Sequence, residues 1–185
     1  MQYPEVMIDL ETTATDPSHG AIIQLSAVRF NLEERSIDTN MFDQCLMIPG
    51  NRFWEEGTRD WWVRECPDVL DAIWPRMRDP QAVLQAFNQW VVRDLGNERP
   101  IMWAKPIHFE YPFVQSYYKQ FNLAIPFAYY EAQDLRSWCR AKGHPDLDRE
   151  IEFEGVKHNA IHDVLHQIKT LFTLEDRTNG QVLAA

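Results

Sequence analysis

Cysteine is scarce in this chain, and its three cysteines lie far apart. Cys45, Cys66 and Cys139 contain no CxxC pair, and their odd number argues against a disulfide framework. A thiolate zinc site needs closely spaced cysteine pairs, which the sequence lacks. We therefore expect reduced cysteines that pack inside the protein.

Long apolar runs are also missing. No stretch of about 18 or more apolar residues occurs, so no membrane span is expected. Residues 1–5 lack the basic and then apolar profile of a secretory signal. We therefore expect a cytoplasmic protein with no membrane partner.

Positive charge is in deficit. The 28 Asp and Glu residues outnumber the 18 Lys and Arg residues, which gives a formal net charge of −10. Nucleic-acid-binding proteins are usually basic, because much of their affinity comes from phosphate contacts. A carboxylate cluster that holds divalent cations reverses the local charge and attracts phosphate. The net charge therefore does not exclude nucleic acid as a partner.

What the chain does contain is enough apolar sequence for one compact domain. Of its 185 residues, 45% are hydrophobic and 25% are charged, a composition typical of a soluble domain with a sizeable core. No internal repeat, low-complexity tract or linker divides the sequence. We expect one domain over residues 1–175 and a flexible C-terminal tail over residues 176–185.

The order of the patterned segments indicates an α/β fold. Apolar runs bounded by turn residues predict strands over 4–10, 21–30, 41–48, 100–104 and 126–130. Helical spacing of apolar residues and helix start signals predict helices over 58–66, 80–95, 112–121, 133–142 and 159–174. Together these elements predict a mixed central β-sheet flanked by helices.

The first predicted strand ends in two carboxylates. Asp9 and Glu11 stand two residues apart, and a strand places such residues on the same face. Hard divalent cations such as Mg²⁺ and Mn²⁺ prefer oxygen ligands, so this pair is suited to hold them. An isolated Asp-x-Glu pair at a strand end also fits two acids that simply face solvent.

A histidine and an aspartate mark the start of the last predicted helix. Asp163 lies off the apolar stripe of helix 159–174, and the positive end of the helix dipole favours its ionised form. Histidine exchanges protons near neutral pH, so His158, just before this helix, is suited to accept a proton from an attacking water. The alternative for His158 is a surface histidine at the helix entry, and we assign His162 to that role.

The run Asp9-Leu10-Glu11-Thr12-Thr13, paired with His158 and Asp163, resembles the DEDDh branch of the DnaQ-type 3′→5′ exonucleases. The resemblance spans most of the chain and implies an RNase H-like fold. It also implies two divalent cations, Mg²⁺ or Mn²⁺, held by the acids, with His158 as general base. The expected partner is a nucleic acid with a 3′ end, in single-stranded form, from which nucleoside 5′-monophosphates are released.

This family also uses a mid-chain carboxylate, normally an aspartate between a strand and a helix. The matching stretch is 102–110, and the acid at the matching position is Glu110. Glutamate is one methylene longer and still reaches an ion if its backbone lies farther back. The ligand set implied by the resemblance is Asp9, Glu11, Glu110 and Asp163. An indirect role for Glu110, or a reduced activity, stays open; Asp134 is expected to be structural and to brace a loop.

A narrower resemblance suggests substrate contacts. Segment 58–62 and the segment Ile161–Asp163 resemble phage-type exodeoxyribonucleases and a related bacterial exoribonuclease group. By resemblance, residues after the metal-binding strand contact the terminal nucleotide, and aromatic rings stack on its base. The expected contacts are Leu10, Thr12, Thr13, Trp61, Trp103 and Phe109. For each aromatic residue, plain core packing is the alternative.

Two other functions compete with an exonuclease. An aspartyl-phosphate phosphatase would use Asp9 as a covalent nucleophile, but it would leave His158 and Asp163 without a role. A nucleic-acid-binding module with weakened catalysis fits Glu110 and the acidic composition. The sequence leaves open DNA or RNA, single strand or duplex end, monomer or dimer, and the biological pathway.

Overall fold

The computed structural model describes residues 2–183 of the chain. The strands are β1 (Glu5–Thr12), β2 (Ile22–Asn31), β3 (Ser36–Ile37), β4 (Phe42–Leu46), β5 (Met77–Arg78), β6 (Ile101–Ala104) and β7 (Gln133–Asp134). The α-helices are α1 (Glu56–Glu65), α2 (Pro67–Ile73), α3 (Pro80–Val91), α4 (Ile107–Gln120), α5 (Leu135–Ala141), α6 (Leu147–Glu150) and α7 (Ala160–Leu183). Two short 3₁₀ turns are η1 (Trp74–Arg76) and η2 (Tyr129–Glu131). Among the described residues, no helix combines the length and the apolar character that crossing a membrane requires.

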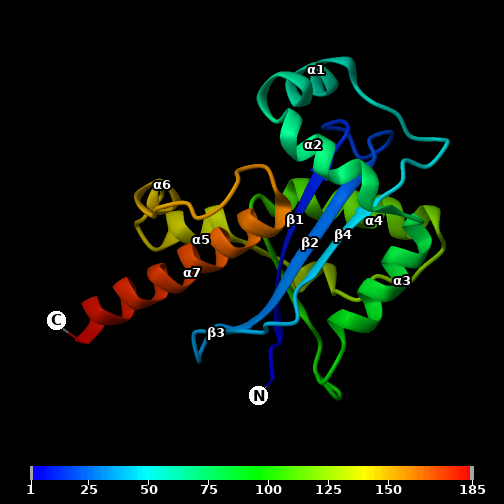
Figure 1. Cartoon of the computed structure of the whole chain (residues 1–185). Helices are drawn as coiled ribbons and strands as arrows, with labels where there is room; N and C mark the ends of the chain where they lie inside the picture. Colours follow the sequence, from blue (N-terminus) through cyan, green and yellow to red (C-terminus); the bar gives the residue numbers. More distant parts are fainter. Residues whose placement is uncertain (1, 184–185) are drawn as a thin grey trace.

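The strands form one mixed sheet with β1 in its interior (Figure 1). The strand order is β5-β4-β2-β1-β6-β7, and β3 pairs with β2 outside this path. β1 runs antiparallel to β2 but parallel to β6, which in turn runs parallel to β7. The C-terminal ends of β1, β6 and β7 therefore meet at one edge of the sheet. This arrangement confirms the predicted α/β fold with a mixed sheet.

Alternate residues of β1 pack into two cores, one on each face of the sheet. Val6 and Ile8 pack with residues of α3 and α4, while Met7 packs with residues of α5 and α7. Figure 1 shows α3 and α4 on one side of the strands and α5 and α7 on the other. Because side chains alternate along a strand, Asp9 and Glu11 follow Met7 toward the face that α7 covers.

α1 and α2 pack over the ends of β2 and β4 in a third cluster, together with buried Ile23 and Cys45. Trp62 of α1 is 2% exposed, and its indole Nε1 donates a hydrogen bond of 3.1 Å to the carbonyl oxygen of Thr12. This bond holds α1 beside the C-terminal end of β1. All three cysteines are buried and free, which confirms that they are packing residues.

α4 begins at Ile107, not at Pro112 as the start signal in the sequence predicts. The reason is a cap supplied by a distant segment. Asp134 Oδ2 accepts a hydrogen bond of 2.8 Å from the backbone N–H of Ile107, which satisfies the first turn of α4. Its other oxygen, Oδ1, accepts one of 2.7 Å from the N–H of Ser137 and caps α5. Asp134 is therefore structural, as expected, and joins two helix starts.

The strand predicted over residues 126–130 is wrong. This segment ends in the 3₁₀ turn η2, and the strand that pairs with β6 comes later, at Gln133–Asp134. Phe127 is buried in the core with Phe87, but Tyr129 and Tyr130 are 74% and 63% exposed, so the segment does not pack as a strand.

α7 continues to Leu183, although the sequence predicts a helix end at Leu174 and a flexible tail from residue 176. Polar contacts with α5 and its C-terminal end stabilise the helix beyond Leu174, where its apolar stripe ends. The buried Glu175 accepts hydrogen bonds of 2.7 Å from Trp138 Nε1 and 2.8 Å from Lys142 Nζ. The expected tail is thus helical through Leu183, and residues 184–185 lie outside the described part.

The double cap by Asp134 gives a test of the fold. Asp134→Ala removes two helix caps and should lower the free energy of unfolding by about 2 kcal/mol, at about 1 kcal/mol for each cap. The matched control is Asp79→Ala, which removes the single cap of α3, a 2.8 Å bond to the N–H of Ala82. Urea denaturation measures both. Equal losses for the two variants would contradict the double cap.

Candidate functional site

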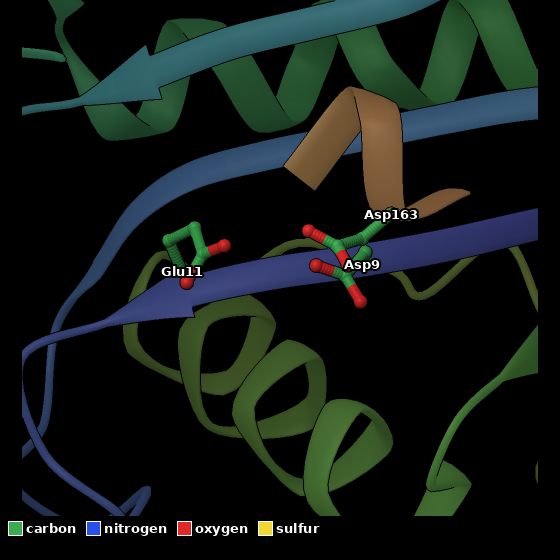
Figure 2. A group of neighbouring side chains, drawn as sticks. All are labelled: Asp9, Glu11 and Asp163. Atoms are coloured by element: carbon green, nitrogen blue, oxygen red, sulfur yellow. The ribbon is translucent and has the colours of Figure 1, made fainter. Parts of the chain in front are cut away.

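Three carboxylates converge at the C-terminal end of β1 (Figure 2). Asp9 and Glu11 extend from β1, and Asp163 reaches them from the first turn of α7. One carboxylate oxygen from each residue lies within 4.8 Å of the others. The structure thus brings together residues from opposite ends of the chain, as the predicted ligand set requires.

Burial and mutual repulsion make these carboxylates unfavourable as bare anions. Burial first, and then the nearby Asp163, raise the pKa of Asp9 to about 8. The pKa of Glu11 lies well above its ordinary value, mainly because of burial and then because of Asp9. Burial also raises the pKa of Asp163, an effect that the nearby His158 opposes. A hard divalent cation would relieve the repulsion, so this donor set fits a metal site.

Glu110 approaches the carboxylates from α4 but does not belong to the group of converging oxygens. It is 4% exposed, and its Oε2 is buried without a hydrogen-bond partner. Burial, followed by repulsion from Asp9, raises its pKa well above the ordinary value, while a backbone contact with Leu10 opposes the shift. A buried carboxylate oxygen without a partner is costly, and a cation would satisfy it.

Two glutamines that belong to no sequence motif hold the site in place. Gln167 Nε2 donates a hydrogen bond of 2.8 Å to Asp9 Oδ1. Gln167 stands one helical turn after Asp163, and this spacing is the sequence signal that points to it. Gln24 on β2 fixes the start of α7, because its Oε1 accepts a hydrogen bond of 3.3 Å from the N–H of Ala160. No local pattern signals a contact between residues 136 positions apart.

His158 lies in the loop before α7 and is exposed. Its backbone has a left-handed φ of 62°. The imidazole meets the ring of Trp61 edge to face, with the centroids 4.9 Å apart. His158 lines the same cleft as Asp9 and Glu11, which has a volume of about 260 Å³. The imidazole is therefore placed beside the carboxylates and open to water.

His162 braces the loop that carries His158. Its Nδ1 accepts a hydrogen bond of 3.0 Å from the backbone N–H of Val156. Gly155, with a φ of +107°, packs so closely that a Cβ there would lie 2.7 Å from Cγ of His162. His162 is therefore more than the helix-entry surface residue that the sequence predicts, because its ring forms the support of the loop.

Three residues predicted to contact substrate lie at or beside the site. Leu10 lines the cleft, although its side chain is only 4% exposed. Trp61 is half-buried and contacts His158. Phe109 directly precedes Glu110 in α4, and its half-buried ring packs 5.0 Å from that of Phe113.

Trp103, Thr12 and Thr13 are engaged in internal contacts. Trp103 is 4% exposed and packs edge to face against Trp138, with the ring centroids 5.8 Å apart, so it follows the core-packing alternative. The hydroxyl of Thr12, a residue 7% exposed, donates a hydrogen bond of 2.8 Å to the carbonyl oxygen of Ala14. The hydroxyl of Thr13 accepts one of 2.7 Å from the N–H of Ala21. These hydroxyls hold the loop after β1.

The raised pKa of Asp9 gives a test of the site. With a pKa of about 8, folded Asp9 keeps a proton at a pH where the unfolded chain has lost it. The stability of the metal-free protein should therefore fall as the pH rises from about 4, near the ordinary pKa of an aspartate, to about 8, and Mn²⁺ should restore it at the higher pH. Thermal denaturation measures this. Asp9→Asn should flatten the pH dependence and weaken the Mn²⁺ effect; an unchanged profile in this variant would contradict the assignment.

The matched control is Asp71→Asn, which changes an exposed acid on α2. It should leave both the pH dependence and the Mn²⁺ effect unchanged.

Comparisons with known proteins agree with this geometry. Residues 4–174 match the family model described as the 3′-5′ exoribonuclease Rv2179c-like domain. No curated protein sequence matches the chain.

Solved structures share the fold at low sequence identity. Cell-death related nuclease 4 (CRN-4) superposes with a TM-score of 0.69 at 16% identity, over 94% of this chain and 64% of that one. The nuclease domain of 3′hExo, a DEDDh family member bound to rAMP, gives 0.64 at 16% identity, over 93% and 92%. The zinc-bound complex of E. coli ExoI with ssDNA gives 0.74 at 14% identity, over 94% and 40%. The chain thus spans less than two thirds of the CRN-4 and ExoI chains.

The family match covers nearly the whole described chain, and the carboxylates of β1 and α7 meet as the DEDDh resemblance implies. The structural neighbours confirm the RNase H-like fold. The chain therefore belongs to the 3′-5′ exoribonuclease Rv2179c-like domain family.

Proposed function

We propose that the protein hydrolyses single-stranded nucleic acid from its 3′ end and releases nucleoside 5′-monophosphates. The observation that carries this proposal is the convergence of Asp9, Glu11 and Asp163 within 4.8 Å, in a cleft that His158 also lines. The proposed cofactors are two divalent cations, Mg²⁺ or Mn²⁺. When bound, such ions lower the pKa of a water and neutralise charge on the scissile phosphate.

The proposed metal ligands are Asp9, Glu11, Asp163 and Glu110. The first three already present converging oxygens. Glu110 is supported by its unpartnered Oε2 and by its electrostatic coupling to Asp9. Gln167 acts as a positioning residue, because its hydrogen bond fixes one oxygen of Asp9.

The proposed general base is His158. Its exposed ring lines the cleft, so it can accept a proton from a water that attacks a phosphate there. The edge-to-face contact with Trp61 restricts the orientation of the ring. The hydrogen bond from the N–H of Val156 to His162 holds the loop from the other side. The contact with Trp61 and the hydrogen bond to His162 therefore both help to position the imidazole of His158.

The proposed substrate is RNA in preference to DNA, because the matched family model is described as an exoribonuclease. The neighbours include a complex with rAMP and a complex with ssDNA, so both polymers belong in the test. Leu10, Trp61 and Phe109 are the proposed contacts with the terminal nucleotide. An aspartyl-phosphate phosphatase is disfavoured, because His158 and Asp163 line the same cleft as Asp9.

The experiment that tests the function uses 5′-labelled single-stranded RNA and DNA with Mg²⁺, with Mn²⁺ and with chelator. We expect metal-dependent, stepwise shortening from the 3′ end and release of mononucleotides, faster on RNA. Asp9→Asn should reduce the rate by more than about a hundredfold, beyond the usual loss from a group that only supports a ligand. Asp71→Asn is the control. Absence of metal-dependent release from both polymers by the unchanged protein would refute the proposal.

The support of the His158 loop gives a second test. His158→Ala should lower kcat by about 10²- to 10⁴-fold, the range that general-base catalysis supplies. Gly155→Ala should also lower kcat, because its Cβ would lie 2.7 Å from Cγ of His162 and displace the loop. Mn²⁺ affinity, measured by calorimetry, should change little in both variants.

The control is Gly50→Ala, since a Cβ at Gly50 meets nothing within 4 Å. Normal kcat in Gly155→Ala, or in His158→Ala, would contradict the role of the loop.

Glu110 gives a third test. It distinguishes an active enzyme from a binding module with weakened catalysis, an alternative that is favoured by the position of Glu110 outside the converging oxygens. Glu110→Asp should retain or increase kcat if the position is a metal ligand. Glu110→Ala should lower both kcat and Mn²⁺ affinity, by about ten- to a hundredfold in affinity. Full activity of Glu110→Ala would exclude Glu110 from the ligand set.

A further inference from the structure

Two hollows adjoin the carboxylate cleft along α5, α6 and the loop before α7. A middle hollow of about 510 Å³ adjoins the cleft and shares Lys105 and His158 with it. An outer hollow of about 220 Å³ shares Lys105 and Arg149 with the middle hollow. Because Lys105 lines the cleft and both hollows, the three spaces lie next to one another on the surface.

The outer hollow is positively charged, although the whole chain carries a net charge of −10. Its charged lining consists of Lys105, Arg136, Arg140, Arg149, Asp146 and Asp148. Both acids are already paired. Asp148 lies 2.5 Å from Lys105 Nζ, and Asp146 lies 3.0 Å from Arg149 Nη1.

Arg136 and Arg140 supply the unpaired charge of the outer hollow. Both are exposed, and neither has an ion pair within the described residues 2–183. They stand four residues apart on α5, so they lie on the same face of the helix. Two free guanidinium groups on one wall of a groove are suited to bind successive phosphates.

The middle hollow is lined by cations and acids in equal number, Lys105, Arg149 and Lys157 with Asp148, Glu152 and Asp163, and it adds an aromatic ring. Phe153 lines it, and Lys157 Nζ lies 5.9 Å from the centroid of that ring. The ring of His166 lies 4.9 Å from Phe153 on the same wall. Grooves that bind single-stranded nucleic acid alternate cations for phosphates with aromatic faces for bases. The middle and outer hollows together show this alternation.

We propose that this groove, from Phe153 and Lys157 to Arg136 and Arg140, binds the substrate strand on the 5′ side of its terminal nucleotide. The proposal rests on the proposed function, because the groove begins at the same cleft. It also places two arginines without ion-pair partners among the described residues, Arg136 and Arg140, where the strand lies in a chain that is acidic as a whole. Longer strands should therefore bind more tightly than dinucleotides, in a salt-dependent manner.

The test measures binding by fluorescence anisotropy, with Ca²⁺ in place of Mg²⁺ so that binding is read without turnover. The probes are a 5′-labelled single strand of about 12 nucleotides, within the usual range of site sizes, and a labelled dinucleotide. Arg140→Gln should weaken binding of the longer strand by about three- to tenfold and reduce its salt slope by about 0.7. Arg140→Lys should restore most of the affinity, and dinucleotide binding should stay the same.

The matched control is Arg78→Gln, which changes an exposed arginine on β5, at the opposite edge of the sheet from β7. Unchanged affinity and an unchanged salt slope in Arg140→Gln would refute the proposal that this groove binds the strand. Equal losses for both probes would also overturn it, as would failure of the unchanged protein to bind the longer strand.

Two further outcomes separate this proposal from others. Binding that depends on Arg140 in a protein without metal-dependent hydrolysis would refute the exonuclease and retain the groove. Displacement of the longer strand by poly-glutamate at lower concentration than by unlabelled oligonucleotide would assign the groove to an acidic protein partner, against the proposal.

Discussion

Electrostatic repulsion among buried carboxylates at the end of β1 is the constraint on which the rest of the site depends. Burial and proximity raise the pKa of Asp9 to about 8 and that of Glu11 well above its ordinary value. A folded chain tolerates such a cluster only where other contacts hold it together. Gln24 anchors the start of α7, and Gln167 binds Asp9 directly. The architecture around β1 therefore holds in place a group of acids that is unfavourable as bare anions.

Several elements around the cluster together hold these carboxylates in place. The β-sheet supplies a rigid base, because β1 is paired on both sides and packed on both faces. α1 closes over the end of β1 through the bond from Trp62 to Thr12 and places Trp61 against His158. α4 brings Glu110 from the opposite face of the sheet. The loop with His158 is exposed, which is the property that a proton acceptor needs.

The parts of the site that local patterns determine could be predicted from the sequence. Period-two alternation correctly placed Asp9 and Glu11 on one face of β1. The start of α3 at Pro80 followed from the Asp79-Pro80 signal, and Asp79 does cap the helix. The pattern of His158 and Asp163 around a helix start correctly placed Asp163 in the first turn of α7 and His158 just before it.

The parts that depend on distant contacts could not be predicted in this way. α4 begins early because Asp134 caps it from 27 residues away. α7 extends past Leu174 because Glu175 binds Trp138 and Lys142 on another helix. The burial of Trp103 depends on Trp138, which no periodic pattern relates to it. In each case the partner is distant in sequence and is brought near only by the tertiary fold.

The central claim is that Asp9, Glu11 and Asp163, with Glu110 beside them, form a metal centre. Anomalous diffraction from crystals grown with Mn²⁺ tests it most directly. The account predicts anomalous peaks within bonding distance of oxygens from all four residues, at about 2.0–2.6 Å, the range for divalent cations with oxygen ligands. Absence of a peak between β1 and the start of α7, in crystals that bind Mn²⁺ elsewhere, would contradict it.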